Sequence, residues 1–128
     1  YQSNFYIFTK SREKKNLGKT VLFKVPNTVG KHKAVFVSEF IFENNSDSRI
    51  TAADISEDRK TIVLLSHKAV ILLTEFEGDR FFSGQIKVIS LGHVSQKEGI
   101  CFKDNTTLII TDEYSKDSKG NLYEFSID

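Results

Sequence analysis

The sequence predicts an all-β fold, because its apolar residues occur in short runs, its turns are polar, and one strand–turn–strand unit recurs. The 128 residues include 11 Phe and a single Pro. Apolar runs such as 62–65 and 70–73 are short and rich in β-branched residues, which is typical of strands. No segment combines helical periodicity, capping residues and helical length. We therefore expect a domain made of strands.

The recurring unit covers residues 55–64 and 101–110, which align without a gap at a spacing of 46 residues. Asp58 matches Asp104 in this alignment, and each lies in the polar turn between two strands. An aspartate in such a turn can accept hydrogen bonds from nearby backbone N–H groups and fix the turn. A third copy of the second strand lies at residues 5–9, at a spacing of 57 residues from 62–66.

Extending the three copies predicts ten strands in three groups. The predicted strands are 4–10, 19–25 and 33–40 in the first group, 50–56, 61–66, 68–75 and 85–91 in the second, and 97–102, 107–112 and 121–127 in the third. Sequential strands recurring at this spacing are typical of propeller blades. We predict a partial β-propeller of two to three four-stranded antiparallel blades. It forms one incomplete domain over 1–128, with blade parts at 1–42, 49–92 and 96–128. A β-sandwich of about ten strands is the alternative.

An incomplete ring would leave an apolar face on each terminal blade. We therefore expect the remaining blades as the partner, either in a missing N-terminal half or in a second chain. The absence of methionine and the start at Tyr1 also suggest a chain cut from something longer.

Composition argues against several classes of partner. With 18 basic and 17 acidic residues the net charge is +1, so no nucleic-acid binding is expected, and the basic run 10–19 is interpreted as a solvated loop. No apolar stretch is long enough for a membrane span. Cys101 is the only cysteine, which excludes an internal disulfide, and its apolar neighbours predict a small buried residue.

Two stretches resemble known propellers. Residues 50–60 resemble the first hairpin of many bacterial propeller blades, and residues 96–100, 108–113 and 120–123 are similar to a stretch in phytase-like β-propellers. The likeness is to the uncharacterised secreted bacterial members of that family, whose C-terminal half the chain resembles. The resemblance implies a propeller fold and a secreted or periplasmic location. The resemblance bears on possible functional residues only over about 96–123.

In phytases of this kind, a glutamate before a glycine and an acidic pair closing the next strand help to bind calcium. The resemblance thus implies that Glu98, Asp112 and Glu113 are calcium ligands, and calcium is the only cofactor that we consider. Calcium prefers six to eight oxygen ligands, which carboxylates on adjacent strands can supply. The pair Asp112–Glu113 stands where the family has two glutamates, and the family's other carboxylates have no counterparts here. The alternative is that these side chains are solvated charges at strand ends.

Asp54 interrupts an apolar strand, so its carboxylate is expected either to face the central channel or to pair with a backbone N–H group. The three histidines, His32, His67 and His93, have no metal-ligand spacing, and His67 lies in a hairpin where we expect it to be exposed. Ser95 lies near His93, but no Gly-x-Ser-x-Gly motif is present. We assign no catalytic residue.

These observations favour a non-catalytic binding or scaffold propeller module of a secreted bacterial protein, with an unknown ligand. The alternative is a calcium-dependent phosphoesterase of phytase type. A third hypothesis is a structural role in which the exposed blade faces dock another chain.

Overall fold

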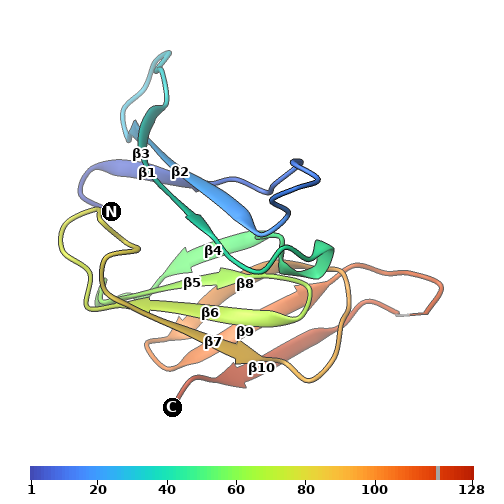
Figure 1. Ribbon diagram of the computed structural model, residues 1–128. Coiled ribbons are helices and arrows are strands. Elements are labelled where there is room, and N and C mark those ends of the chain that lie inside the picture. The colour runs from blue at the N-terminus through green and yellow to red at the C-terminus, as the bar shows by residue number, and fades with distance from the viewer. Residues whose placement is uncertain (118) are drawn as a thin grey trace.

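The computed structural model describes residues 1–117 and 119–128 as ten strands in three antiparallel sheets (Figure 1). The first sheet contains β1 (Asn4–Phe8), β2 (Lys19–Pro26) and β3 (Val35–Ile41). The middle sheet contains β4 (Ala52–Ile55), β5 (Thr61–Leu65), β6 (Ala69–Thr74) and β7 (Gln85–Ser90). The third sheet contains β8 (Lys97–Asp104), β9 (Thr107–Asp112) and β10 (Leu122–Ser126). The short 3-10 helix η1 (Ser46–Ser48) joins the first sheet to the middle one.

The predicted all-β class is confirmed, and each predicted strand has a counterpart whose ends differ by at most a few residues. Strands that are consecutive in sequence are neighbours in every sheet, with the orders β1-β2-β3, β4-β5-β6-β7 and β10-β9-β8. The described residues contain no α-helix, and none of their helices is long and apolar enough to cross a membrane.

The repeated turn aspartates accept hydrogen bonds within their turns, as their position in the sequence predicts. In the β4–β5 turn, Asp58 Oδ1 accepts hydrogen bonds from the Lys60 backbone N at 3.0 Å and from Ser56 Oγ at 2.7 Å. In the β8–β9 turn, Asp104 Oδ1 accepts from the Thr106 backbone N at 2.9 Å. The same side chain therefore closes the same hairpin one repeat apart.

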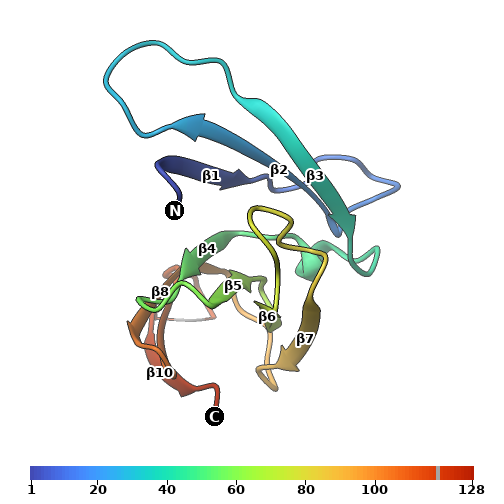
Figure 2. The ribbon, with the colours of Figure 1, turned by 90° about the vertical axis from the view of Figure 1, so that its left-hand side faces the viewer.

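The three sheets stack in sequence order, with the middle sheet between the other two (Figure 2). Alternate residues of β5 point to opposite faces, so Ile62 and Leu64 enter one core while Val63 and Leu65 enter the other. The central strands of the middle sheet, β5 and β6, are consequently buried on both faces, and this explains why they are almost continuously apolar.

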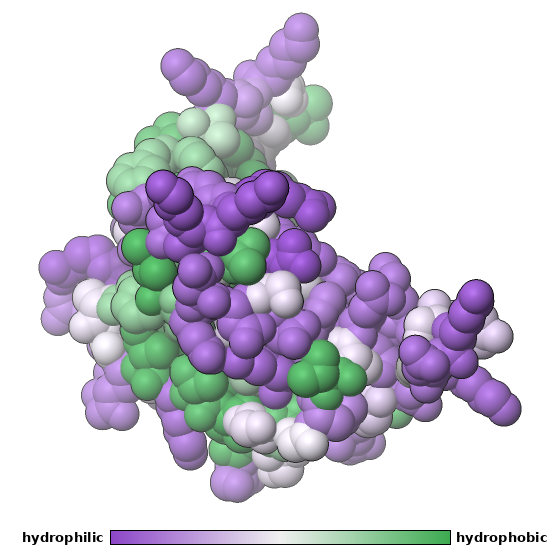
Figure 3. Space-filling model, turned by 45° about the vertical axis from the view of Figure 1, so that its right-hand side comes forward, coloured by the Kyte–Doolittle hydropathy of each residue, from purple (hydrophilic) through white to green (hydrophobic). Residues whose placement is uncertain are grey.

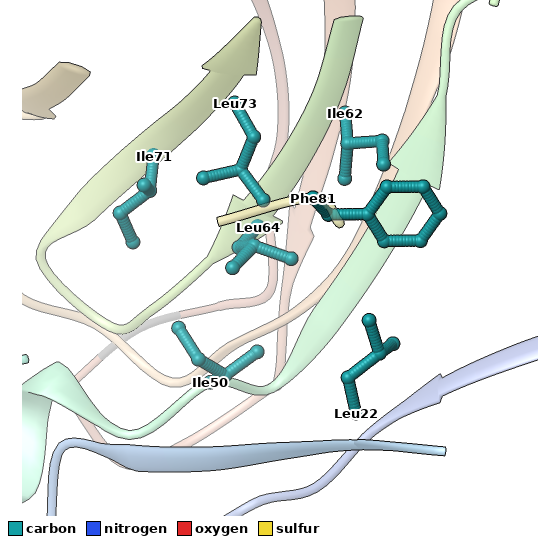
Figure 4. Close-up of a cluster of buried hydrophobic side chains, with 7 residues drawn as sticks. All are labelled: Leu22, Ile50, Ile62, Leu64, Ile71, Leu73 and Phe81. Carbon is teal, nitrogen blue, oxygen red and sulfur yellow. The ribbon is translucent and has the colours of Figure 1, made fainter. Parts of the chain in front are cut away.

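The core between the first and middle sheets is centred on Phe81, which belongs to the β6–β7 connection and is 1% exposed (Figure 4). Its ring centroid lies 4.9 Å from that of Tyr6 and 5.1 Å from that of Phe76. Leu22 reaches this core from β2. The connection thus folds back and fills the space between the two sheets with an aromatic side chain.

The prediction that Cys101 is buried is wrong, because its side chain is exposed. Its neighbours Ile100 and Phe102 both pack against the core between the middle and third sheets. Strand alternation then points Cys101 to the opposite face of the third sheet. An apolar run predicts a strand here, but does not tell which face of that strand is covered.

Candidate functional site

The first strands of the middle and third sheets, β4 and β8, lie against each other. Asp54 Oδ2 accepts a hydrogen bond from the Phe102 backbone N at 2.8 Å, and Thr51 Oγ1 donates to the Lys97 backbone O at 2.6 Å. Of the two roles expected for Asp54, the structure displays the pairing with a backbone N–H group. Asp54 therefore ties two sheets together, and it also lines the pocket described below.

A polar cluster forms where the ends of all three sheets meet. Glu98 on β8 accepts hydrogen bonds at Oε1 from Lys10 Nζ and from His67 Nε2, both at 3.1 Å. Lys10 follows β1, and His67 lies in the β5–β6 hairpin. Burial raises the pKa of Glu98, but the bonds from His67 and Lys10 together outweigh burial and leave this pKa below its ordinary value. Glu98 is an ion-paired carboxylate that joins three sheets.

This cluster corrects the prediction for His67. Its side chain is only 12% exposed, because the ring lies between Glu98 and Asp47, whose Oδ1 is 3.9 Å from His67 Nδ1. Sequence reasoning also missed Lys10, which is 88 residues from Glu98. No local pattern distinguishes Lys10 from the other basic residues of the loop that follows β1.

Asp112 anchors a second network in the third sheet. Its Oδ2 accepts hydrogen bonds from Ser95 Oγ and Tyr123 OH, both at 2.8 Å. Lys97, which is 1% exposed, donates from Nζ to Ser95 Oγ at 2.8 Å and to the His67 backbone O at 3.0 Å. Burial lowers the pKa of Lys97. Ser95 Oγ and the His67 backbone O nevertheless give the buried Lys97 ammonium two hydrogen-bond acceptors.

The predicted calcium ligands are not gathered at one point. Glu98 and Asp112 belong to the two networks just described, while Glu113 is exposed and its backbone N donates to the Gln96 backbone O at 2.9 Å. In 1–117 and 119–128, no group of three or more His, Cys, Asp or Glu residues could hold a metal ion. The assignment of calcium to these residues stays a prediction.

Ser95 and Asp112 are in direct contact, but His93 is not placed between them. His93 Nδ1 lies 3.2 Å from the Leu91 backbone O, and the His93 ring packs near Tyr123 with the centroids 5.4 Å apart. The nitrogen that contacts Ser95 is Lys97 Nζ. Ser95 Oγ donates its hydrogen to Asp112, so its geometry is that of a bridge between two charged groups.

A pocket of about 230 Å³ lies between β1 and β4. Tyr6 and Phe8 line it from β1, Ala53 and Asp54 line it from β4, and Phe81 lies among the other lining residues. Because β1 is at the edge of its sheet, the pocket borders a strand that has a neighbour on one side only.

Carboxylates at the sheet junctions predict a loss of stability in acid. The hydrogen bond from Lys24 lowers the pKa of Asp79 on the β6–β7 connection, and the networks above lower the pKa values of Glu98 and Asp112 despite burial. A carboxyl group with a lower pKa in the folded chain stabilises the fold above its unfolded pKa of about 4. This contribution is lost as the pH falls through the folded pKa.

We therefore expect the midpoint of thermal unfolding to be steady near neutral pH and to fall as the pH drops below about 5. Calorimetry from pH 7 to pH 2 measures this directly. Asp112→Asn should flatten the acid limb, whereas Asp128→Asn, at an exposed position, should leave it unchanged. An acid limb that is identical in the wild-type and Asp112→Asn proteins would contradict the role given to Asp112.

Comparison of the chain with protein-family models, with curated proteins and with solved structures finds no match. The likeness to phytase-like propellers accordingly stays a prediction.

Proposed function

We propose that the three sheets are successive blades of a β-propeller segment, and that the segment is a non-catalytic binding or scaffold module. The observation that carries the proposal is the contact between β4 and β8, the first strands of two consecutive sheets. In a propeller, the first strands of neighbouring blades line the central channel. The bond from Thr51 to Lys97, which are one repeat of 46 residues apart, supports this arrangement.

The binding surface that we propose is the outer face of the first sheet, meaning the face turned away from the middle sheet. Phe5 and Ile7 are 58% and 45% exposed on it. In the repeat they match Ile62 and Leu64, which are 3% and 0% exposed because the first sheet covers them. Apolar side chains cluster over the first sheet in the upper part of Figure 3. By this equivalence, a further sheet of the same kind, on the same polypeptide or a second chain, covers the outer face.

The polar networks support a non-catalytic role. Catalytic groups are usually held close to a space where a substrate can react. Here the side chains of Glu98 and Asp112 are engaged by lysine, histidine, serine and tyrosine partners that join the sheets to one another. Lys97 is buried and directed at acceptors of the protein itself. These interactions fix the stacking of the sheets.

Association of the chain tests this proposal. At tens of micromolar we expect sedimentation equilibrium to give species heavier than the 14.6 kDa monomer, because the outer face of the first sheet is apolar. The double substitution Phe5→Lys and Ile7→Lys should restore the monomer. Val88→Lys, a matched change at a residue that is 60% exposed on β7, should not. A wild-type chain that stays monomeric throughout would contradict the proposed binding surface.

A further inference from the structure

The connection between β6 and β7 is longer than its hairpin requires. β6 ends at Thr74 and β7 begins at Gln85, and these two residues lie directly opposite each other. At the other end of the same ladder, the Leu91 backbone N donates to the Lys68 backbone O at 2.9 Å. Hydrogen-bonded pairs alternate along an antiparallel ladder, which makes Thr74 and Gln85 such a pair. A turn of two residues can close a hairpin from such a pair, so the hairpin itself does not need residues 75–84.

The two ends of the 75–84 loop are held together at the edge of the middle sheet. Gln85 Nε2 donates a hydrogen bond to Glu75 Oε2 at 2.8 Å. Gly84 packs so closely against the Thr74 backbone O that there is no room for a Cβ atom. A loop whose ends are close and whose interior is packed by its own side chains is a compact surface element. In Figure 2 this loop rises from the middle sheet toward the first sheet.

Aromatic side chains of this loop reach the inner face of the first sheet. The ring centroid of Phe82 lies 6.0 Å from that of Phe8 on β1 and 5.2 Å from that of Phe40 on β3. Phe81 shares its core with Leu22, which comes from β2. The loop thus spans the first sheet from one edge strand to the other.

Polar groups of the same loop bind the first sheet as well. Asp79 Oδ2 accepts hydrogen bonds from Lys24 Nζ at 2.7 Å and from Tyr6 OH at 3.4 Å. The Gly78 backbone O accepts from Tyr1 OH at 2.9 Å. The Asp79 side chain is 25% exposed, so its ion pair with Lys24 is partly shielded from water. The loop is therefore attached to the first sheet by apolar and by polar contacts.

The first sheet has few other attachments. In the part of the chain that the structure describes, no strand of the first sheet lies against a strand of the middle sheet as β8 lies against β4. Lys10 Nζ donates to Glu98 Oε1 at 3.1 Å, and Lys68 Nζ donates to Glu43 Oε2 at 2.6 Å. Glu43 is exposed, and ion pairs of exposed side chains contribute little to stability. The backbones of the two sheets are thus held apart, and the loop fills the space between them.

We propose that the 75–84 loop is a strap that holds the first sheet on the middle sheet, and that its release frees the first sheet alone. The core between the middle and third sheets is built from residues outside the loop, among them Val63 and Ile110. That pair of sheets should therefore stay folded when the loop is released. Release would expose Ile62 and Leu64, and so give the chain a second apolar surface. The strap is independent of what covers the outer face of the first sheet.

Hydrogen exchange of the full chain, followed by mass spectrometry, tests the strap. The variant has the dipeptide Asn-Gly in place of residues 75–84, which leaves the β6–β7 hairpin closed by a two-residue turn. We expect the amides of β2, the central strand of the first sheet, to exchange about tenfold faster or more, because the sheet then opens without global unfolding. The amides of β9 should keep their protection.

A single substitution keeps the length of the loop. Asp79→Asn removes the charge that pairs with Lys24 and should speed exchange in β2 by about threefold. Glu77→Gln is the matched control, because that carboxylate lies in the same loop and is 81% exposed, and it should leave exchange in β2 unchanged. Unchanged protection of β2 without the loop, equal loss in β2 and β9, or equal effects of the two substitutions would overturn the proposal.

Discussion

Replacing Phe81 with alanine is expected to cost about 3–5 kcal/mol of unfolding free energy, the usual cost of deleting a fully buried aromatic ring. The ring is 1% exposed, and its centroid lies within 6.3 Å of those of Tyr1, Tyr6 and Phe8 as well as Phe76. The loss should be large because the ring packs against both the first and the middle sheets. Its removal leaves a cavity at their interface.

Denaturant unfolding followed by tyrosine fluorescence and circular dichroism measures this loss. Tyr114→Ala, at a residue that is 77% exposed, is the aromatic control and should change the unfolding free energy by less than about 0.5 kcal/mol. If Phe81→Ala unfolded at nearly the same denaturant concentration as the wild type, Phe81 would not be the centre of that core.

Ile110→Ala should cost about 2–5 kcal/mol through the second core. Ile110 is 1% exposed and packs between the middle and third sheets, whereas its neighbour Ile109 points to the opposite face. Ile109→Ala is therefore a matched control of identical chemistry one residue away. We expect it to cost distinctly less, because that face of the third sheet is only partly covered.

Equilibrium unfolding of the two isoleucine variants also checks the register of β9. A shift of one residue would exchange the roles of Ile109 and Ile110. A larger loss in Ile109→Ala than in Ile110→Ala would thus contradict the register and the identity of the buried face.

The hairpins could be predicted from the sequence because their determinants are local. Alternation, short apolar runs and a turn aspartate repeated at Asp58 and Asp104 lie within a few residues of the structure that they specify. The same signals predicted the number of strands and their order along the chain.

Contacts between sheets could not be predicted in this way. Glu98 and Lys10 are 88 residues apart, and nothing in the pattern around either residue indicates the other. The hairpin position of His67 predicts an exposed side chain, yet a glutamate from another sheet covers it. The apolar neighbours of Cys101 predict a buried side chain, but the side chain is exposed, because an apolar strand does not show which of its faces has a partner sheet.

Sequential stacking of three sheets is the premise behind both proposals, and nuclear Overhauser contacts between methyl and aromatic groups test it most directly. We predict that Ile62 has contacts to Tyr6 or Phe8, that Val63 has contacts to Ile110, and that the methyl and aromatic groups on β1, β2 and β3 have no contacts to those on β8, β9 and β10. Contacts from Tyr6 or Phe8 to Ile110 would mean that the first and third sheets face each other, and the stacked arrangement would be contradicted.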